Sequence, residues 1–209
     1  MTQNKQAETS ERKDYREAAE KLSQKLSALG YVPYYAPTAA DALAKVIELI
    51  PEGASVGVPG TLTIRQMGAI DKLKELGHTV VEHWAADQTA ADKLEARYGE
   101  AQCDVFLTSS NAITEDGELV NIDGSGNRLA AMCWSRGDRI YVISMNKLCA
   151  DIPAALKRIY DKVAPTNAER LGIGNARSIC RATLILNAAP TMPAGKKACV
   201  ILTGEPLGY

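Results

Sequence analysis

The chain has 209 residues, 46% of them hydrophobic, and is long enough to bury a sizeable core as one domain, with or without a helical appendage. Its 24 basic and 25 acidic residues are balanced and its aromatic residues are sparse, which argues against nucleic acid and anionic membranes as partners. No stretch approaches the ~20 apolar residues of a membrane span, and the polar segment 1–16 lacks a signal peptide's apolar core, so we expect a cytoplasmic protein.

Patterns typical of helices and strands alternate along most of the chain. Threonine at 38 and aspartate at 151 are expected to cap helices, and glycines at 30 and 77 to end them. The expected elements, in chain order, are a helix at 9–29, an extended connector or an edge strand at 31–37, a helix at 38–50, a strand at 54–58, a helix at 64–76, a strand at 78–81, a helix at 91–98, strands at 104–108 and 118–122, a helix at 127–134, a strand at 138–144, a helix at 151–163, a separate short helix ending at 171, and strands at 183–186 and 198–202.

This alternation predicts a three-layer α/β domain with a mainly parallel sheet. An antiparallel element is expected where strand 118–122 follows strand 104–108 so closely. Residues 1–37 are expected to form an N-terminal helix and connector packed on a domain of residues 38–209. Ligands of such sheets bind beyond the carboxyl ends of the strands, so the residues that follow each strand are the first candidates for a site.

The cysteines and histidines do not indicate a metal site. Five cysteines are scattered without a CxxC pair, and small buried side chains are their more frequent role. His78 and His83 lie five positions apart across a strand-like segment, which directs them to opposite faces. We therefore expect no metal among the ligands of this chain.

The turn after strand 54–58 is a candidate anion site. Gly60 and Thr61 lead from that strand into a helix, where free backbone N–H groups favour negative charge. The other interpretation is an ordinary tight turn, which any α/β unit needs at this place.

A polar segment after strand 104–108 is the strongest candidate for chemistry. Ser109, Ser110 and Asn111 can donate hydrogen bonds to a carboxylate or phosphate, or cap the next turn. Glu115, ahead of Asp116, is the candidate catalytic carboxylate, as an acid/base group or as a nucleophile toward an acyl group. The alternative is a polar hairpin turn with solvated acids.

A glycine-rich loop and a later basic pair could complete the site. Gly124, Gly126 and Asn127 allow backbone N–H groups to approach an anion, which Arg128 could hold bidentately. A flexible loop with a surface arginine is the alternative. Asn146-Lys147 follows strand 138–144 at the same sheet edge, where Lys147 is either a second positive contact or an ordinary lysine.

The motif Asn111-Ala-Ile-Thr-Glu-Asp-Gly-Glu-Leu-Val-Asn-Ile-Asp-Gly124, followed by Gly126-Asn-Arg-Leu-Ala-Ala-Met132, resembles the LUD domain family, the lactate utilization proteins of the LutC/YkgG type, also called DUF162. Asn146-Lys147 and the segments 164–172 and 204–209 match the same subgroup. The resemblance covers essentially the whole chain. It implies a NagB/RpiA/CoA-transferase-like fold and a role around lactate or a related organic acid, in company with iron–sulfur partner proteins.

The chain departs from this subgroup at one place. Related chains carry a Cys-rich insert just before the segment 177–180, whereas only Cys180 remains here. We therefore expect no metal or redox role from such a cluster, and no cofactor is identified.

Three functions stay open from the sequence. The chain could be an enzyme or ligand-processing subunit for a small anionic metabolite or its thioester or phosphorylated form, a noncatalytic subunit that docks onto iron–sulfur partners, or a metabolite sensor. A homodimer is expected on general grounds.

Overall fold

The computed structural model describes the backbone from Thr2 to Tyr209 and the side chains from Tyr15 onward. Met1 and most side chains of the polar segment 1–16 therefore lie outside the described residues. Along the described part of the chain, no helix combines the length and the apolar character that crossing a membrane requires.

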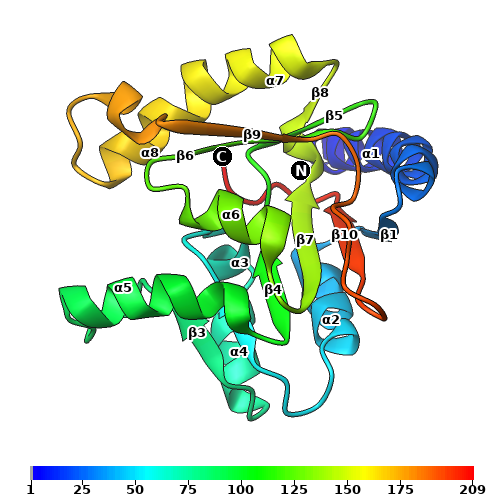
Figure 1. Ribbon diagram of the computed structural model, residues 1–209. Helices are drawn as coiled ribbons and strands as arrows, with labels where there is room; N and C mark the ends of the chain where they lie inside the picture. Colours follow the sequence, from blue (N-terminus) through cyan, green and yellow to red (C-terminus); the bar gives the residue numbers. More distant parts are fainter. Residues whose placement is uncertain (1) are drawn as a thin grey trace.

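Within residues 2–209, ten strands form two sheets, joined by α-helices and short 3-10 or π segments (Figure 1). The strands are β1 Val32–Ala36, β2 Val56–Val58, β3 Val80–Glu82, β4 Val105–Thr108, β5 Ala112–Thr114, β6 Leu119–Asp123, β7 Asp138–Ser144, β8 Leu148–Cys149, β9 Ala182–Leu186 and β10 Ala198–Thr203. The α-helices are α1 Thr2–Ala28, α2 Ala39–Leu49, α3 Leu62–Gln66, α4 Ala69–Glu75, α5 Ala90–Gly99, α6 Asn127–Trp134, α7 Ile152–Arg158 and α8 Ala164–Arg170. The remaining turns are η1 Glu100–Gln102, η2 Met145–Lys147, η3 Ile159–Val163 and η4 Ala176–Ile179.

The main sheet has six parallel strands in the order β1-β10-β7-β4-β2-β3. One core packs α2, α3 and α4 on one face, and a second core packs α1 and α6 on the other. Val105 and Leu107 of β4 point into the first core and Phe106 into the second, which follows from the two-residue period of a strand. The prediction of a three-layer α/β domain is confirmed.

A smaller sheet of β8-β5-β6-β9 lies across the second core. β6 pairs antiparallel with β5 and with β9, so the expected antiparallel element belongs to this sheet and does not pair with β4. The outer face packs on α7 and on the helical turns after it, which lie over the small sheet at the top of Figure 1. This second sheet was not predicted, because β5 and β8 are only three and two residues long.

The N-terminal helix and the connector are both tied to the main sheet. Ala19, Leu22 and Leu26 of α1 are buried in the second core. Of the two interpretations of segment 31–37, the edge strand is the one observed, since β1 pairs in parallel with β10 from Val32 to Ala36. Its two neighbouring tyrosines are only partly covered, as is typical of an edge.

Two predicted helix boundaries were wrong. Segment 64–76 is two helices, because Gly68 has φ 72°, a left-handed conformation that ends α3 and begins α4. Pro165 does not interrupt the chain before a separate short helix. It lies in the first turn of α8, where its missing N–H is tolerated, and the π segment η3 joins α7 to α8 without a loop.

Candidate functional site

A cavity of about 280 Å³ opens at the carboxyl edge of the main sheet. It adjoins β2, where the strand order reverses: the chain goes from β2 to β3 on one side and returns from β3 to β4 on the other side of β2. Open α/β sheets bind ligands at such a place. Its walls come from the loops after β2, β3 and β4, from η2, from the loop before α6, from α8 and from the C-terminal segment. The lining residues are Gly60, Thr61, Leu62, Thr63, His83, Trp84, Arg97, Ser109, Ser110, Asn111, Ile122, Asp123, Gly124, Ser125, Asn127, Arg128, Lys147, Val163, Ala164, Asn167, Arg170, Leu171, Ile179, Gly208 and Tyr209.

Nine of the residues proposed from the sequence meet in this cavity. They are Gly60, Thr61, Ser109, Ser110, Asn111, Gly124, Asn127, Arg128 and Lys147. Gly126 and Asn146 do not line it: Gly126 precedes α6 with φ 85°, and the backbone oxygen of Asn146 accepts a hydrogen bond from Arg158. The carboxyl-edge rule thus pointed to segments that line the cavity, while packing decided which of their side chains face it.

The structure places Glu115 away from the cavity. It is exposed in the turn between β5 and β6, and its backbone N–H donates to Cys149. Its neighbour Asp116 pairs with Lys25 of α1. The turn joins two strands of the small sheet and contacts α1, so Glu115 does not line the cavity.

Lys147 is the most deeply placed charged group of the cavity. The residue is 3% exposed, and its Nζ lies 2.8 Å from Thr63 Oγ1, 3.0 Å from Ser109 Oγ and 3.2 Å from the Ser110 carbonyl oxygen. Burial, together with the positive charges of Arg158 and Arg128, lowers the pKa of Lys147 to about 7. Its amine therefore loses its proton near neutral pH.

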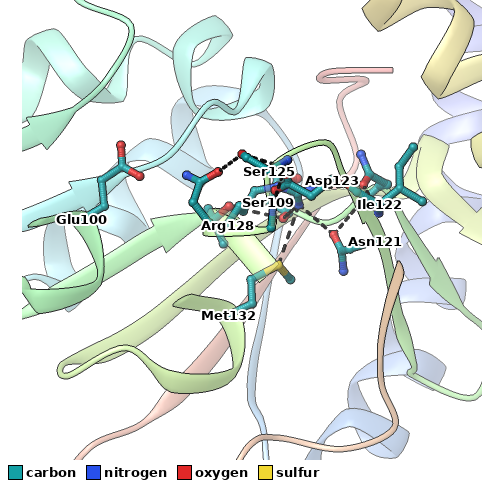
Figure 2. Close-up of polar contacts among 12 residues, drawn as sticks. Glu100, Ser109, Asn121, Ile122, Asp123, Ser125, Arg128 and Met132 are labelled. Atoms are coloured by element: carbon teal, nitrogen blue, oxygen red, sulfur yellow. Dashed lines mark hydrogen bonds and ion pairs between the residues drawn. The ribbon is translucent and has the colours of Figure 1, made fainter. Parts of the chain in front are cut away.

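Arg128 holds the walls of the cavity together (Figure 2). Its Nη1 donates to Asn121 Oδ1 at 2.9 Å, and its Nη2 donates to Asn111 Oδ1 at 3.0 Å and to the Ile122 carbonyl at 2.7 Å. Its Nε lies 3.7 Å from Asp123. These hydrogen bonds use both Nη groups of the guanidinium. The groups that could hold an anion bidentately therefore bind the protein itself.

The glycine-rich loop before α6 is ordered by its own hydrogen bonds. Asp123 Oδ1 accepts from the backbone N–H groups of Ser125 and Gly126 at 3.1 and 3.3 Å. The Ser125 hydroxyl donates to Asn127 Oδ1 at 2.7 Å. The loop therefore has a hydrogen-bonded conformation, in place of the flexible loop of the alternative interpretation.

Trp84 and two arginines form the outer part of the cavity. The guanidinium of Arg170 lies 4.5 Å from the Trp84 ring centroid, and Arg170 also donates to Asn167 and to the Tyr209 hydroxyl. Arg97 of α5 lines the same region and is exposed. An arginine held on an aromatic face by such partners is preorganised to meet a carboxylate or phosphate.

Gly60 provides space for this aromatic ring. A Cβ at Gly60 would lie 2.5 Å from Trp84 Cζ2. Glycine is thus required here for close packing, whatever the turn does for an anion.

We expect Gly60→Ala to destabilise the protein by about 1–3 kcal/mol, because the added methyl group overpacks the Trp84 ring. Urea unfolding followed by Trp84 fluorescence in a Trp134→Phe background measures both the stability and the displacement of the ring. Gly174→Ala is the control, since a Cβ there meets no atom within 4 Å. An unchanged spectrum and midpoint for Gly60→Ala would contradict this role.

His83 and Glu100 form a buried pair that was not predicted from the sequence. His83 Nδ1 lies 2.5 Å from Glu100 Oε1, and Glu100 is 1% exposed. Burial raises the pKa of Glu100, and the hydrogen bond from His83 opposes this change. A carboxylate at Nδ1 favours the tautomer that leaves Nε2 as a proton acceptor. The sequence did contain one indication of His83: it directly follows β3, and residues that follow strands are candidates for a site at the carboxyl edge of the sheet.

Metal-ligating side chains are dispersed among the described residues. No three histidine, cysteine, aspartate or glutamate side chains of that part of the chain come close enough to hold an ion. All five cysteines are free thiols; Cys103 and Cys199 are buried and the other three are half-buried. The cavity therefore offers positive charge and hydroxyl groups as its binding chemistry.

A model of the LUD domain family matches residues 19–191. The chain belongs to the LUD domain family. Among solved structures, the crystal structure of a DUF162 family protein from Deinococcus radiodurans is similar to this LUD domain protein, with a TM-score of 0.57 and 14% sequence identity. The likeness covers 91% of this chain and 98% of that chain and concerns the fold alone. A comparison with curated proteins finds no match.

Proposed function

We propose that this LUD domain protein binds a small organic anion, or its thioester or phosphorylated form, in the cavity at the carboxyl edge of the main sheet. The family's association with lactate utilization makes hydroxy acids, oxo acids and their activated forms the first compounds to test. The observation that carries the proposal is the charge of the cavity. Among its described lining residues, the three arginines Arg97, Arg128 and Arg170 face a single acid, Asp123.

The two available arginines belong to the outer part of the cavity. Asp123 and the amide oxygens already engage Arg128, and Lys147 is buried at the inner end. Arg170 is exposed but is oriented by Trp84, Asn167 and Tyr209. We infer that Arg170, with Arg97, holds the carboxylate or phosphate, so that the rest of the ligand reaches toward Ser109 and Lys147.

The size of the cavity restricts the ligand to a small metabolite. About 280 Å³ is at the lower end of the volumes that bind small molecules. A larger carrier, such as the pantetheine arm of a thioester, would have to extend past the arginines into solvent. Small free acids and short acyl thioesters both satisfy this limit.

We expect Arg170→Gln to weaken binding of the anion about 10- to 100-fold, because a hydrogen bond to a charged group contributes about 1.5–3 kcal/mol. Melting temperatures would be measured with lactate, pyruvate, short acyl thioesters and sugar phosphates, since a ligand at one hundred times its Kd stabilises by about 2.7 kcal/mol. The matched control is Arg181→Gln, an exposed arginine outside the cavity lining.

A panel in which no compound raises the melting temperature of the wild-type protein would overturn the binding proposal. In that case the docking of this chain onto iron–sulfur partner proteins becomes the better hypothesis, and co-purification tests it. A shift that survives in Arg170→Gln but not in Arg181→Gln would place the anion elsewhere on the surface.

A further inference from the structure

The surroundings of Lys147 suit a neutral amine. None of the acidic side chains described in the structure forms an ion pair with it, and its nearest charged influences are Arg158 and Arg128. A lysine buried among positive charges loses its proton readily, as catalytic lysine bases must. The same lysine is part of the cavity lining, so its amine is beside any bound ligand.

The three hydrogen-bond partners of Lys147 accept from its ammonium form, and because two of them are hydroxyl groups they also serve its neutral amine. A neutral amine has two N–H donors and one lone pair. The Ser110 carbonyl can only accept, so it takes one N–H at 3.2 Å. The Thr63 hydroxyl at 2.8 Å takes the second. Lys147 Nζ donates to Ser109 Oγ at 3.0 Å while the amine is protonated. In the neutral amine the remaining lone pair faces this hydroxyl and takes its proton, which is the contact between a base and its nucleophile.

Ser109 has the least constrained hydroxyl group of this cluster, because its own donation to the Ser110 carbonyl is long, at 3.4 Å. The Ser110 hydroxyl donates to the Ala112 carbonyl at 2.7 Å and holds the backbone of the small sheet. The Thr63 hydroxyl accepts from Lys147 and lies against Gly208 of the C-terminal segment, where an added Cβ would be 2.6 Å from the hydroxyl and 3.0 Å from Lys147 Nζ. Arg128 Nη1 lies 3.5 Å from the Ser109 carbonyl and steadies the backbone of the serine.

We propose that Ser109 and Lys147 form a nucleophile and base pair that transfers the acyl group of a small anionic ester or thioester to water. This inference rests on the anion-binding function proposed above, because the arginines of the outer cavity hold the negative end of the substrate. The acyl carbonyl then lies between those arginines and the serine hydroxyl. The class of substrate is a short acyl compound with a carboxylate or phosphate group.

The reaction needs no reactant other than the ester and water. Ser109 Oγ attacks the carbonyl carbon while Lys147 Nζ takes the hydroxyl proton. The bond from that carbon to the leaving oxygen or sulfur then breaks, and Lys147 returns the proton to the leaving group. Water next attacks the acyl-serine ester, Lys147 accepts its proton, and Ser109 leaves with that proton as the free acid forms.

The test uses the full chain and two chromogenic esters. Mono-4-nitrophenyl succinate carries a carboxylate and 4-nitrophenyl acetate does not. We expect release of 4-nitrophenolate and a succinyl group on Ser109, located by peptide mass spectrometry. Ser109→Ala and Lys147→Met should each slow release at least ~100-fold, the usual contribution of a positioned base. Arg170→Gln should slow the charged ester more than the neutral one.

Three results would overturn the inference. The first is an acyl group on Lys147, which would make the amine the nucleophile. The second is acylation that Ser109→Ala does not change but the exposed control Ser27→Ala does. The third is no acylation of a wild-type chain whose melting temperature rises with small anions. That third result would leave the binding function intact, whereas the absence of both effects would remove the binding function as well.

If Ser109→Ala does not fold, Ser109→Cys retains the shape, and its thiol should become acylated.

Discussion

Arg128→Met is expected to lower the free energy of unfolding by about 3–5 kcal/mol, the range seen when one partner of a buried charged network is removed. The guanidinium donates to Asn121, Asn111 and the Ile122 carbonyl, and methionine donates to none of them. Each buried acceptor left without a partner adds its own desolvation cost. Asp123 would also lose its positive neighbour.

Urea unfolding at neutral pH measures this effect, with Arg136→Met as the matched control. Arg136 is exposed and absent from the cavity lining, so its replacement should change stability by less than about 0.5 kcal/mol. If Arg128→Met were as stable as the control yet no longer bound anions, Arg128 would be a ligand contact and its role in holding the walls would be wrong.

The stability of the wild-type protein relative to Lys147→Met is expected to rise with pH above about 7. Lys147 has a pKa of about 7 in the folded chain against an ordinary lysine value of 10.5, so between these values the unfolded chain binds a proton that the folded chain does not. Stability rises with pH wherever the unfolded state binds more protons. Below pH 7 both states are protonated, and the folded protein carries the full cost of the buried charge.

The expected change is about 1.4 kcal/mol for each pH unit in that window, or roughly 2–3 kcal/mol between pH 7 and pH 9. Urea unfolding of both proteins at several pH values measures it, and the titrations of all other groups cancel in the difference. The charged groups that act on the amine are Arg158 and Arg128, and both favour the neutral form. Parallel pH profiles of the two proteins would mean that Lys147 stays charged in the fold, and Lys162→Met at an exposed position should show such parallel profiles.

Local hydrogen-bond patterns made several elements predictable. Thr38 caps α2 as expected and forms a capping box with Asp41, and Asp151 caps α7 by accepting from Ala154. Both depend on residues three positions apart, so the sequence around them contains the whole interaction. The apolar, β-branched centre of β7 likewise identified a buried strand.

The prediction was weaker where short elements depend on distant partners. β5 and β8 form because each pairs within a small sheet that β6 and β9 complete, and no local pattern contains that pairing. Gly68 was expected to continue a helix because apolar periodicity runs through it, but its left-handed conformation ends α3. Glycine serves either as a tolerated helix residue or as a break, and packing decides between them.

The sequence by itself determined the three-layer α/β class, the family and the loops that carry the site, because strand and helix periods and the rule that ligands bind at the carboxyl edge depend on local order. Only the tertiary structure decided which side chains line the cavity. Lys147 meets Thr63, 84 positions away, and His83 meets Glu100 across 17 positions, whereas Glu115 points outward. Burial and neighbouring charge, which give Lys147 its lowered pKa, arise only when distant segments pack together.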